Sequence, residues 1–187
     1  MEEQSSLKMI GVKDEDELSS ITLRRFDVSD IDDFMVWATD ERVSRYCRWD
    51  TVRSRDVAMN YITNRIMVHP WTRAICLNDR AIGRISVKPH SGNERCRGDL
   101  SYVVASKYWG KGVATKAVSM VVASIFEEWP HLERLEALVE VENIGSQKVL
   151  EKAGFKREGV LRKYFILKGS TRDVVVYSFI STDAKVD

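Results

Sequence analysis

The chain has 187 residues, of which 29 are Lys or Arg and 28 are Asp or Glu, so its formal net charge is only +1. The charges are unevenly distributed, because residues 1–40 carry 11 acidic and 4 basic side chains, whereas residues 41–187 carry 17 and 25. Solvated surface charge accounts for most of them, but a basic body also suits an anionic ligand bound after residue 40. A chain of this length can bury one substantial core, so we expect one domain.

Composition excludes several classes of protein. With 44% hydrophobic and 30% charged residues, the sequence is typical neither of a disordered chain nor of a membrane-spanning one. Its N-terminus lacks the pattern of a signal peptide. Three scattered cysteines and three scattered histidines predict neither a disulfide framework nor a metal site. We expect a cytoplasmic protein, with a nuclear location also open, that binds no metal and no membrane.

The predicted structure begins near residue 20. Residues 1–19 are polar and acidic with little periodicity, so we expect a flexible leader there, followed by a single domain over residues 20–182. Alternation of polar and apolar residues over 21–26 predicts the first strand. Ser29 stands at the predicted N-cap of the helix that follows.

A second helix and three strands are expected next. Apolar spacing predicts a helix over residues 55–68, which Pro70 ends. Two β-prone runs, 72–77 and 81–88, are separated by a short polar turn and read as a hairpin. A third strand is predicted over residues 98–104.

The second half of the chain mixes strands and helices. A glycine turn leads into a long apolar helix at about residues 112–128, which Pro130 ends. A strand, a helix ended by a glycine and a final hairpin follow at 134–140, 145–152, 155–167 and 172–180. The predicted order is therefore β-α-α-β-β-β-α-β-α-β-β. This order favours a mixed sheet with antiparallel hairpins and one right-handed crossover through the long helix.

The turn from Gly110 to Gly112 carries the most chemical information. A strand that runs through a Gly-x-Gly turn into a helix presents unpaired backbone N–H groups at the positive end of the helix dipole, and this arrangement binds phosphate. The P-loop pattern fails because no glycine stands five residues before Gly110. The dinucleotide fingerprint fits only in part, since Thr115 occupies the third glycine position. A tight connection that binds nothing remains an alternative.

Two motifs resemble those of a known family. The segment Trp109-Gly110-Lys111-Gly112-Val113-Ala114 resembles the acetyl-CoA pyrophosphate loop of the GNAT superfamily of N-acetyltransferases, with Trp109 in place of the usual Gln or Arg. That replacement, preceded by Tyr108, is similar to the branch of ribosomal-protein-alanine N-acetyltransferases of the RimJ/RimL type. Residues 141–155 resemble the second motif of the family, and residues 23–26 resemble the first strand of the branch.

The resemblance covers residues 20–180 and implies a fold. It implies a three-layer α/β (mixed α+β) fold with a central, mixed and mostly antiparallel sheet of about seven strands, splayed between the fourth and the fifth, and with helices on both faces. It also implies direct transfer of an acetyl group from acetyl-CoA to a primary amine in a ternary complex. The acceptor would be a protein or peptide N-terminal α-amine or a small amine.

The resemblance also implies which residues hold the cosubstrate. The backbone of the strand end would pair with the pantetheine arm, and an N–H near Val104 would hold the thioester carbonyl. The glycine turn and the helix start would face the pyrophosphate, and two polar residues of the second motif would lie beside the sulfur. The implied set is Val103, Val104, Trp109, Gly110, Lys111, Gly112, Val113, Ala114, Thr115, Asn143 and Ser146.

Catalytic roles follow from the same likeness. Asp99 stands where many family members place a glutamate, so it is the candidate base, acting directly or through a water molecule. Ser146 or Tyr164 would supply the proton to the leaving thiolate. Ordinary structural roles stay open for each: a salt bridge to a flanking arginine for Asp99, helix capping for Asn143, and core packing for Tyr164.

The acceptor site and the partners are less defined. The family likeness places the acceptor near Tyr46, Arg48, Trp49, Trp71 and residues close to Phe165, and core packing stays open for Trp49 and Trp71. An arginine-rich loop over residues 42–55 does not suit a strongly cationic substrate such as a polyamine, and could meet the CoA 3′-phosphate or an acidic peptide instead. We expect a monomer or weak homodimer that binds no specific nucleic acid. A catalytically degenerate CoA-binding regulatory module is the alternative function.

Overall fold

The computed structural model describes residues 18–184, so the leader predicted over residues 1–19 lies almost wholly outside the described residues. The helices and strands follow one another in nearly the predicted order. Their bounds are β1 Ile21–Arg24, α2 Ile31–Ala38, α3 Glu41–Ser44, α4 Arg55–Tyr61, β2 Thr72–Leu77, β3 Arg80–Pro89, β4 Arg97–Val104, α5 Val113–Glu128, β5 Arg134–Glu140, α6 Ile144–Lys152, β6 Lys156–Leu167 and β7 Ser170–Ile180.

The strands form one seven-stranded sheet in the order β1-β2-β3-β4-β5-β7-β6. Every neighbouring pair is antiparallel except β4 and β5, which run parallel. Helix α5 makes the crossover between these two strands, as a parallel connection requires. The prediction of a mixed, mostly antiparallel sheet of seven strands is confirmed.

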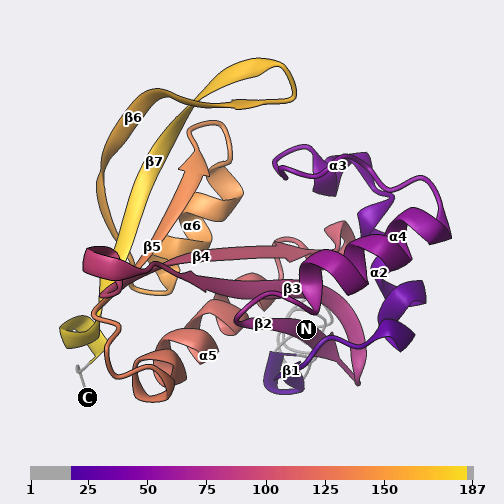
Figure 1. The fold of residues 1–187 in the computed structure, drawn as a ribbon, viewed down its shortest axis with the longest axis horizontal. Helices are drawn as coiled ribbons and strands as arrows, with labels where there is room; N and C mark the ends of the chain where they lie inside the picture. The colour runs from indigo at the N-terminus through magenta and orange to yellow at the C-terminus, as the bar shows by residue number, and fades with distance from the viewer. Residues whose placement is uncertain (1–17, 185–187) are drawn as a thin grey trace, which may run out of the picture.

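Strands β4 and β5 separate after a short paired region. They pair only from Arg97 opposite Arg134 to Asp99 opposite Glu136. Beyond these positions β4 continues to Val104 and β5 continues to Glu140 without pairing to each other. Figure 1 shows β4 running across the view while β5 rises away from it. A wedge therefore opens between the two strands toward their C-terminal ends, which confirms the predicted splay.

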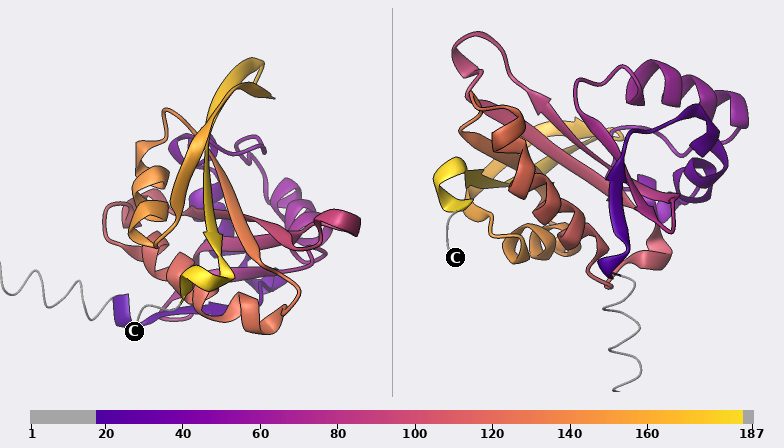
Figure 2. Two further views of the ribbon diagram at one scale, coloured as in Figure 1. Left: turned by 90° about the vertical axis from the view of Figure 1, so that its left-hand side faces the viewer. Right: turned by 90° about the horizontal axis from the view of Figure 1, so that it is seen from below.

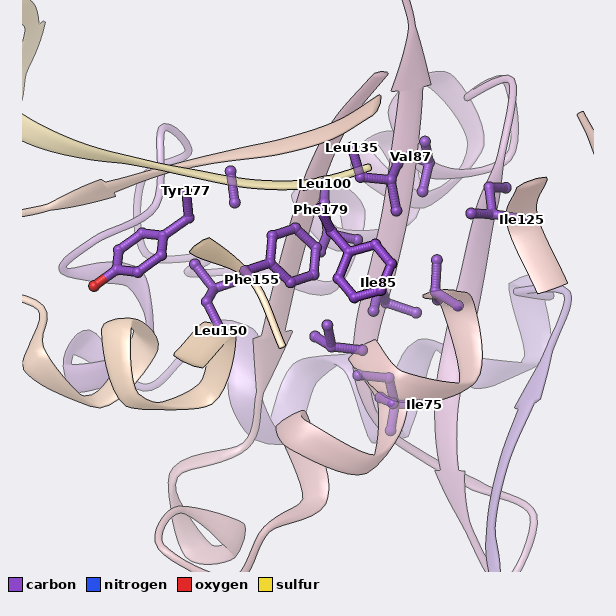
Figure 3. Packing of buried hydrophobic residues seen from close by; sticks show 14 of the residues in the cluster. Ile75, Ile85, Val87, Leu100, Ile125, Leu135, Leu150, Phe155, Tyr177 and Phe179 are labelled. Carbon is purple, nitrogen blue, oxygen red and sulfur yellow. The ribbon is translucent and has the colours of Figure 1, made fainter. Parts of the chain in front are cut away.

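Helices cover both faces of the sheet, as predicted. Helices α5 and α6 lie on one face, and α2 and α4 lie on the other (Figure 2). The larger apolar core lies under α5 and α6 and is shown in Figure 3, where the rings of Phe155 and Phe179 pack with centroids 5.5 Å apart. Burial of such side chains is the main force that holds the helices to the sheet.

The second core lies under α2 and α4 and is aromatic. Phe34 and Trp37 are fully buried, their ring centroids are 4.6 Å apart, and the Trp37 indole donates to the Ala81 carbonyl at 3.2 Å. Trp49 packs edge-on against Trp37. Trp71 belongs to the core on the opposite face, where its indole donates to Glu128. Trp71 is therefore a core residue, which is the alternative that the sequence left open for it.

Two predicted details of the helices are also wrong. Asp27, rather than Ser29, caps the entry into α2, because its carboxylate accepts from the Ser29 amide at 2.8 Å ahead of a single 3-10 turn. The predicted second helix is regular only over α4 and then continues as a π-helical turn, Ile62–Ile66. Within residues 18–184, no helix is long and apolar enough to span a membrane.

The hairpin of β6 and β7 projects beyond the rest of the sheet (Figures 1 and 2). Strand β6 is the edge strand and is mostly exposed, with a bulge between Leu161 and Phe165. The tip of the hairpin is tied to the end of α3, because the Lys168 ammonium donates to the Ser44 carbonyl at 2.8 Å. This bond links the hairpin tip to the helical segment that follows α2.

Candidate functional site

The glycine turn lies at the start of α5, as predicted. Gly110 and Gly112 have φ values of 76° and 81°, in the left-handed region that favours glycine. No side chain caps the helix at Gly112, and the amide of Lys116 is the first to bond back to Gly112. The amides of residues 113–115 thus have no acceptor within the helix. No atom would lie within 4 Å of a Cβ at Gly110, so the turn is open to a ligand.

Trp109 fastens this turn to the end of β4. Its indole N–H donates to the Val104 carbonyl at 2.8 Å, while the ring is 49% exposed. The ammonium groups of Lys107 and Lys111 lie 4.8 and 5.9 Å from the centroid of the Tyr108 ring. Backbone amides at a helix start, with lysines beside them, fit an anionic group such as a pyrophosphate.

The turn and the wedge adjoin, because β4 ends at Val104 and the turn follows directly. Val104 is buried in the core under α5, whereas Val103 faces the opposite side, toward α2 and α4. An elongated ligand with its phosphates at the turn has only one continuation along β4, which is the wedge beside these two valines. The structure therefore places the predicted cradle and the predicted strand end together.

The second motif lies across the wedge from β4. The Asn143 side chain accepts from the Ser146 amide at 3.1 Å, so Asn143 is the N-cap of α6. The Ser146 hydroxyl lies 2.7 Å from the hydroxyl of Tyr102, which also donates to the Ser146 carbonyl at 3.0 Å. Burial raises the pKa of Tyr102 above its usual range, so its hydroxyl stays protonated at neutral pH.

Tyr102 was missed in the sequence. Its position on β4 between Leu100 and Val104, both of which are buried under α5, was the available signal, because side chains two apart on a strand share a face. Tyr164, in contrast, lies in the bulge of β6 and is 51% exposed. The hydroxyl of Ser146 is paired with Tyr102 and not with Tyr164.

Asp99 lies at the closed end of the wedge. Its carboxylate is 2.8 Å from His90 Nε2, and the expected alternative, a salt bridge to a flanking arginine, is not what forms. Arg97 instead pairs with Glu94 and Glu136. His90 was not singled out in the sequence, since it lies in the loop after β3 and reaches Asp99 only because β3 and β4 pair.

Three potential metal ligands meet at this closed end. One ligand atom from each of His90, Asp99 and Glu136 lies within 4.8 Å of the others. The carboxylate of Glu136, however, is bound by the guanidinium groups of Arg97 and Arg134. A carboxylate already paired with two arginines is a poor cation ligand, so we interpret this cluster as an ion-pair network.

A cavity of about 430 Å³ lies beside residues that the sequence predicted for the acceptor site. It lies between the loop after α3 and the tip of the β6–β7 hairpin and is lined by Arg48, Asp50 and residues 165–168. The Arg48 guanidinium lies 5.3 Å from the centroid of the Phe165 ring. Of the predicted acceptor residues, these two are brought together.

One buried carboxylate was also missed in the sequence. Glu140, the last residue of β5, is 8% exposed, and its Oε1 atom has no hydrogen-bond partner among the described residues. Its other oxygen lies 3.5 Å from Arg172 Nε. Burial raises the pKa of Glu140, because an ionised carboxylate is poorly solvated there. Buried polar atoms are seldom left unpaired in proteins, so this residue needs an explanation.

Comparison with known proteins identifies the family. Residues 20–156 match the acetyltransferase (GNAT) domain model. The chain is 28% identical over 169 residues to the uncharacterized N-acetyltransferase p20 of Bacillus licheniformis, covering 87% of this chain and 94% of that protein.

Solved structures share the fold. The ribosomal L7/L12 α-N-protein acetyltransferase RimL in complex with CoA superposes with a TM-score of 0.76 at 18% identity, over 89% of this chain and 96% of that one. The spermidine N-acetyltransferase of Vibrio cholerae in complex with CoA and spermine gives 0.72 at 20% identity, over 89% and 98%. With a family model matched over most of its length and a sheet split in the same way as the motifs imply, the chain belongs to the GNAT family of acetyltransferases.

Proposed function

We propose that this protein transfers the acetyl group of acetyl-CoA directly to a primary amine, with both substrates bound at once. The observation that carries the proposal is the wedge between β4 and β5, whose open end meets the uncapped start of α5 at Gly110 and Gly112. This geometry supports a ligand with phosphates at one end and a narrow arm at the other, which describes CoA.

The residues of the wedge supply the remaining requirements. The thioester end of the arm would lie beside Val103 and Val104, with a backbone N–H there to hold its carbonyl oxygen. Asp99 lies four residues before Val103 on β4, so it is the candidate to take the proton that the amine loses, through a chain of water molecules along the wedge. Tyr102 and Ser146 form a hydroxyl pair that can return a proton to the sulfur as it leaves.

Similar proteins support the chemistry and differ in the acceptor. RimL is named for a ribosomal protein N-terminus and the Vibrio cholerae enzyme for spermidine. Trp109 in the glycine turn supports placing this chain in the RimJ/RimL-like branch. We also propose a cytoplasmic location.

The direct test is calorimetry with acetyl-CoA. We expect binding to the wild-type protein and loss of binding in Gly110→Glu, because a carboxylate would then stand among the amides of the turn. Gly92→Glu is the matched control, since Gly92 also has a positive φ and open space around it but lies in a distant loop. Equal binding by the two variants would show that the phosphates bind elsewhere.

Turnover separates an enzyme from a binding module. Mass spectrometry of a panel of peptides, amino acids and amines incubated with the protein and acetyl-CoA should show products heavier by one acetyl group. Binding of acetyl-CoA without any product would replace the enzyme with the alternative, a CoA-binding regulatory module.

A further inference from the structure

A half-buried arginine lies beside the place proposed for the thioester. Arg84 on β3 is directly opposite Val103 on β4, so the two side chains share the face of the sheet that looks toward α2 and α4. Among residues 18–184, Arg84 has no ion pair and no hydrogen bond from its guanidinium group. A guanidinium group that is partly removed from water and lacks a carboxylate partner is available to bind an anionic ligand.

Glu140 lies across the wedge from Val103, the same number of residues along its strand. Asp99 and Glu136 are the last paired residues of β4 and β5, and Val103 and Glu140 each lie four residues further along their strands. Both are therefore about 13 Å above the closed end of the wedge, given the rise per residue of a strand. Glu140 thus lies on one arm of the wedge, and Arg84 lies behind the other arm, on the strand next to β4.

The charges of Arg84 and Glu140 both act on Cys47. The Cys47 thiol, in the loop after α3, is acted on by the charges of Arg84, Lys168 and Glu140. Cys47 is therefore close enough to both Arg84 and Glu140 for its thiol to be influenced by their charges. These charges are brought together by β3, β5 and the tip of the hairpin.

The other charged groups around Glu140 are mostly cationic. Arg172 on β7, Arg45 at the end of α3 and Lys168 at the hairpin tip all face it, and Glu142 is the one acidic neighbour. Each additional positive charge on a ligand bound here would be repelled by these cationic side chains. A single ammonium group can approach Glu140, whereas a chain of several would be repelled.

We propose that the acceptor is an amine with an anionic group attached close to it, of which a free α-amino acid is the simplest form, and that Glu140 binds its ammonium group while Arg84 binds the anion. In such a molecule the two charges are joined through one carbon atom, so holding the anion beside Val103 also holds the nitrogen next to the acetyl group. A peptide with an acidic first residue presents the same chemistry. This inference rests on the proposed acetyl transfer and names its substrate class.

The test compares each amino acid with its amide. The wild-type enzyme should acetylate free L-amino acids with a kcat/KM on the order of 10- to 100-fold above that for the corresponding amino acid amides, which lack the negative charge. Arg84→Gln should bring this ratio close to one without changing the affinity for acetyl-CoA. Arg25→Gln, the same change at an exposed arginine directly after β1, should leave this ratio unchanged.

Glu140→Gln tests the other half of the site. We expect a rise in the KM for the amine on the order of 10- to 100-fold with a smaller change in kcat, because the variant loses a charged partner for the ammonium group. Glu133→Gln, the same change at an exposed position outside this cluster, should leave KM unchanged. If Glu140 only neutralised Arg172, then Arg172→Gln would raise the KM as much as Glu140→Gln does, and the proposal would be wrong.

The same rates are then measured with peptides and with polyamines as acceptors. A preference for peptides that begin with Asp over those that begin with Asn, larger than the preference among free amino acids, would identify an acidic peptide terminus as the source of the anion. Equal rates with acids and amides, or a preference for spermidine, would overturn this inference and leave the acetyltransferase function standing. No turnover with any amine would overturn the proposed function, and the inference with it.

Discussion

The hydroxyl groups of Tyr102 and Ser146 lie 2.7 Å apart and join strand β4 to helix α6 across the wedge. Both residues lie beside the path proposed for the pantetheine arm, and the tyrosine keeps its proton because burial raises its pKa. We propose that this pair passes a proton to the thiolate as it leaves. It is a better placed donor than Tyr164, whose ring is half exposed on the hairpin.

Removal of the tyrosine hydroxyl should slow the chemical step. We expect Tyr102→Phe to lower kcat on the order of 10- to 100-fold while leaving acetyl-CoA affinity within about twofold, as is typical of the loss of a proton donor. Steady-state kinetics and calorimetry would measure the two effects. Tyr61→Phe is the control, since Tyr61 stacks on Phe34 without a hydrogen bond from its hydroxyl among the described residues. An unchanged kcat in Tyr102→Phe would exclude the pair as the donor.

The second prediction concerns the base. If Asp99 takes the amine proton through water, Asp99→Asn should lower kcat on the order of 10²-fold or more at neutral pH, and part of the loss should be recovered at high pH, where the free amine is abundant. The pH dependence of kcat for both proteins measures this. His90→Gln should produce a smaller loss, because His90 contacts Asp99 and not the substrate. A normal kcat in Asp99→Asn would transfer the role to another carboxylate, with Glu140 the first to test.

The third prediction concerns Trp109. Trp109→Phe retains an aromatic ring but removes the hydrogen bond to Val104, which should cost about 1 kcal/mol and loosen the turn. We expect several-fold weaker binding of acetyl-CoA with little change in the thermal midpoint of unfolding. Trp129→Phe, at the far end of α5, is the matched control. Calorimetric affinities that are equal in both variants would contradict a role for Trp109 in shaping the cradle.

The fourth prediction concerns acid stability. Hydrogen bonds from Arg134 and Ser178 lower the pKa of Glu158 to about 2. A carboxyl group whose pKa is depressed in the folded protein stabilises the fold above its unfolded value, 4.5, and this contribution is lost as the pH falls toward 2. Glu158→Gln should therefore reduce the free energy of unfolding at pH 7 and flatten its decline between pH 4.5 and pH 2.

Denaturant unfolding at several pH values would measure that slope. Glu133→Gln is a suitable control, because Glu133 is exposed and has no ion pair among the described residues. A decline in Glu158→Gln as steep as in the wild type would show that other carboxylates dominate acid unfolding.

The fifth prediction concerns Glu140 and neutral pH. Because burial raises its pKa, ionised Glu140 destabilises the fold, and that cost is relieved as the pH falls through its folded pKa toward the unfolded one. Glu140→Gln should therefore raise the thermal midpoint of unfolding at pH 7 while it impairs acceptor binding. A lower midpoint would indicate that the residue is mainly structural.

Local patterns predicted most of the secondary structure. Strands β2 and β5 begin and end at the predicted residues, and α5 begins one residue after Gly112, because alternation and glycine turns report backbone preferences directly. The cap at Asp27 was assigned to Ser29 because both residue types cap helices and only the fold shows which one begins the turn. Helix α3 has only four residues, too few for a periodic pattern.

The sequence by itself determined the family and the glycine turn, because the glycines of the turn and the motif after β5 are each contiguous in the chain. The tertiary structure alone decided which side chains meet in the wedge. Tyr102 of β4 meets Ser146 of α6 on the face under α5, whereas Arg84 of β3 and Glu140 of β5 lie on the opposite face. These placements depend on the order of the strands and on the separation of β4 from β5. No local pattern encodes that separation, since charges far apart in the chain interact only after the sheet has formed around them.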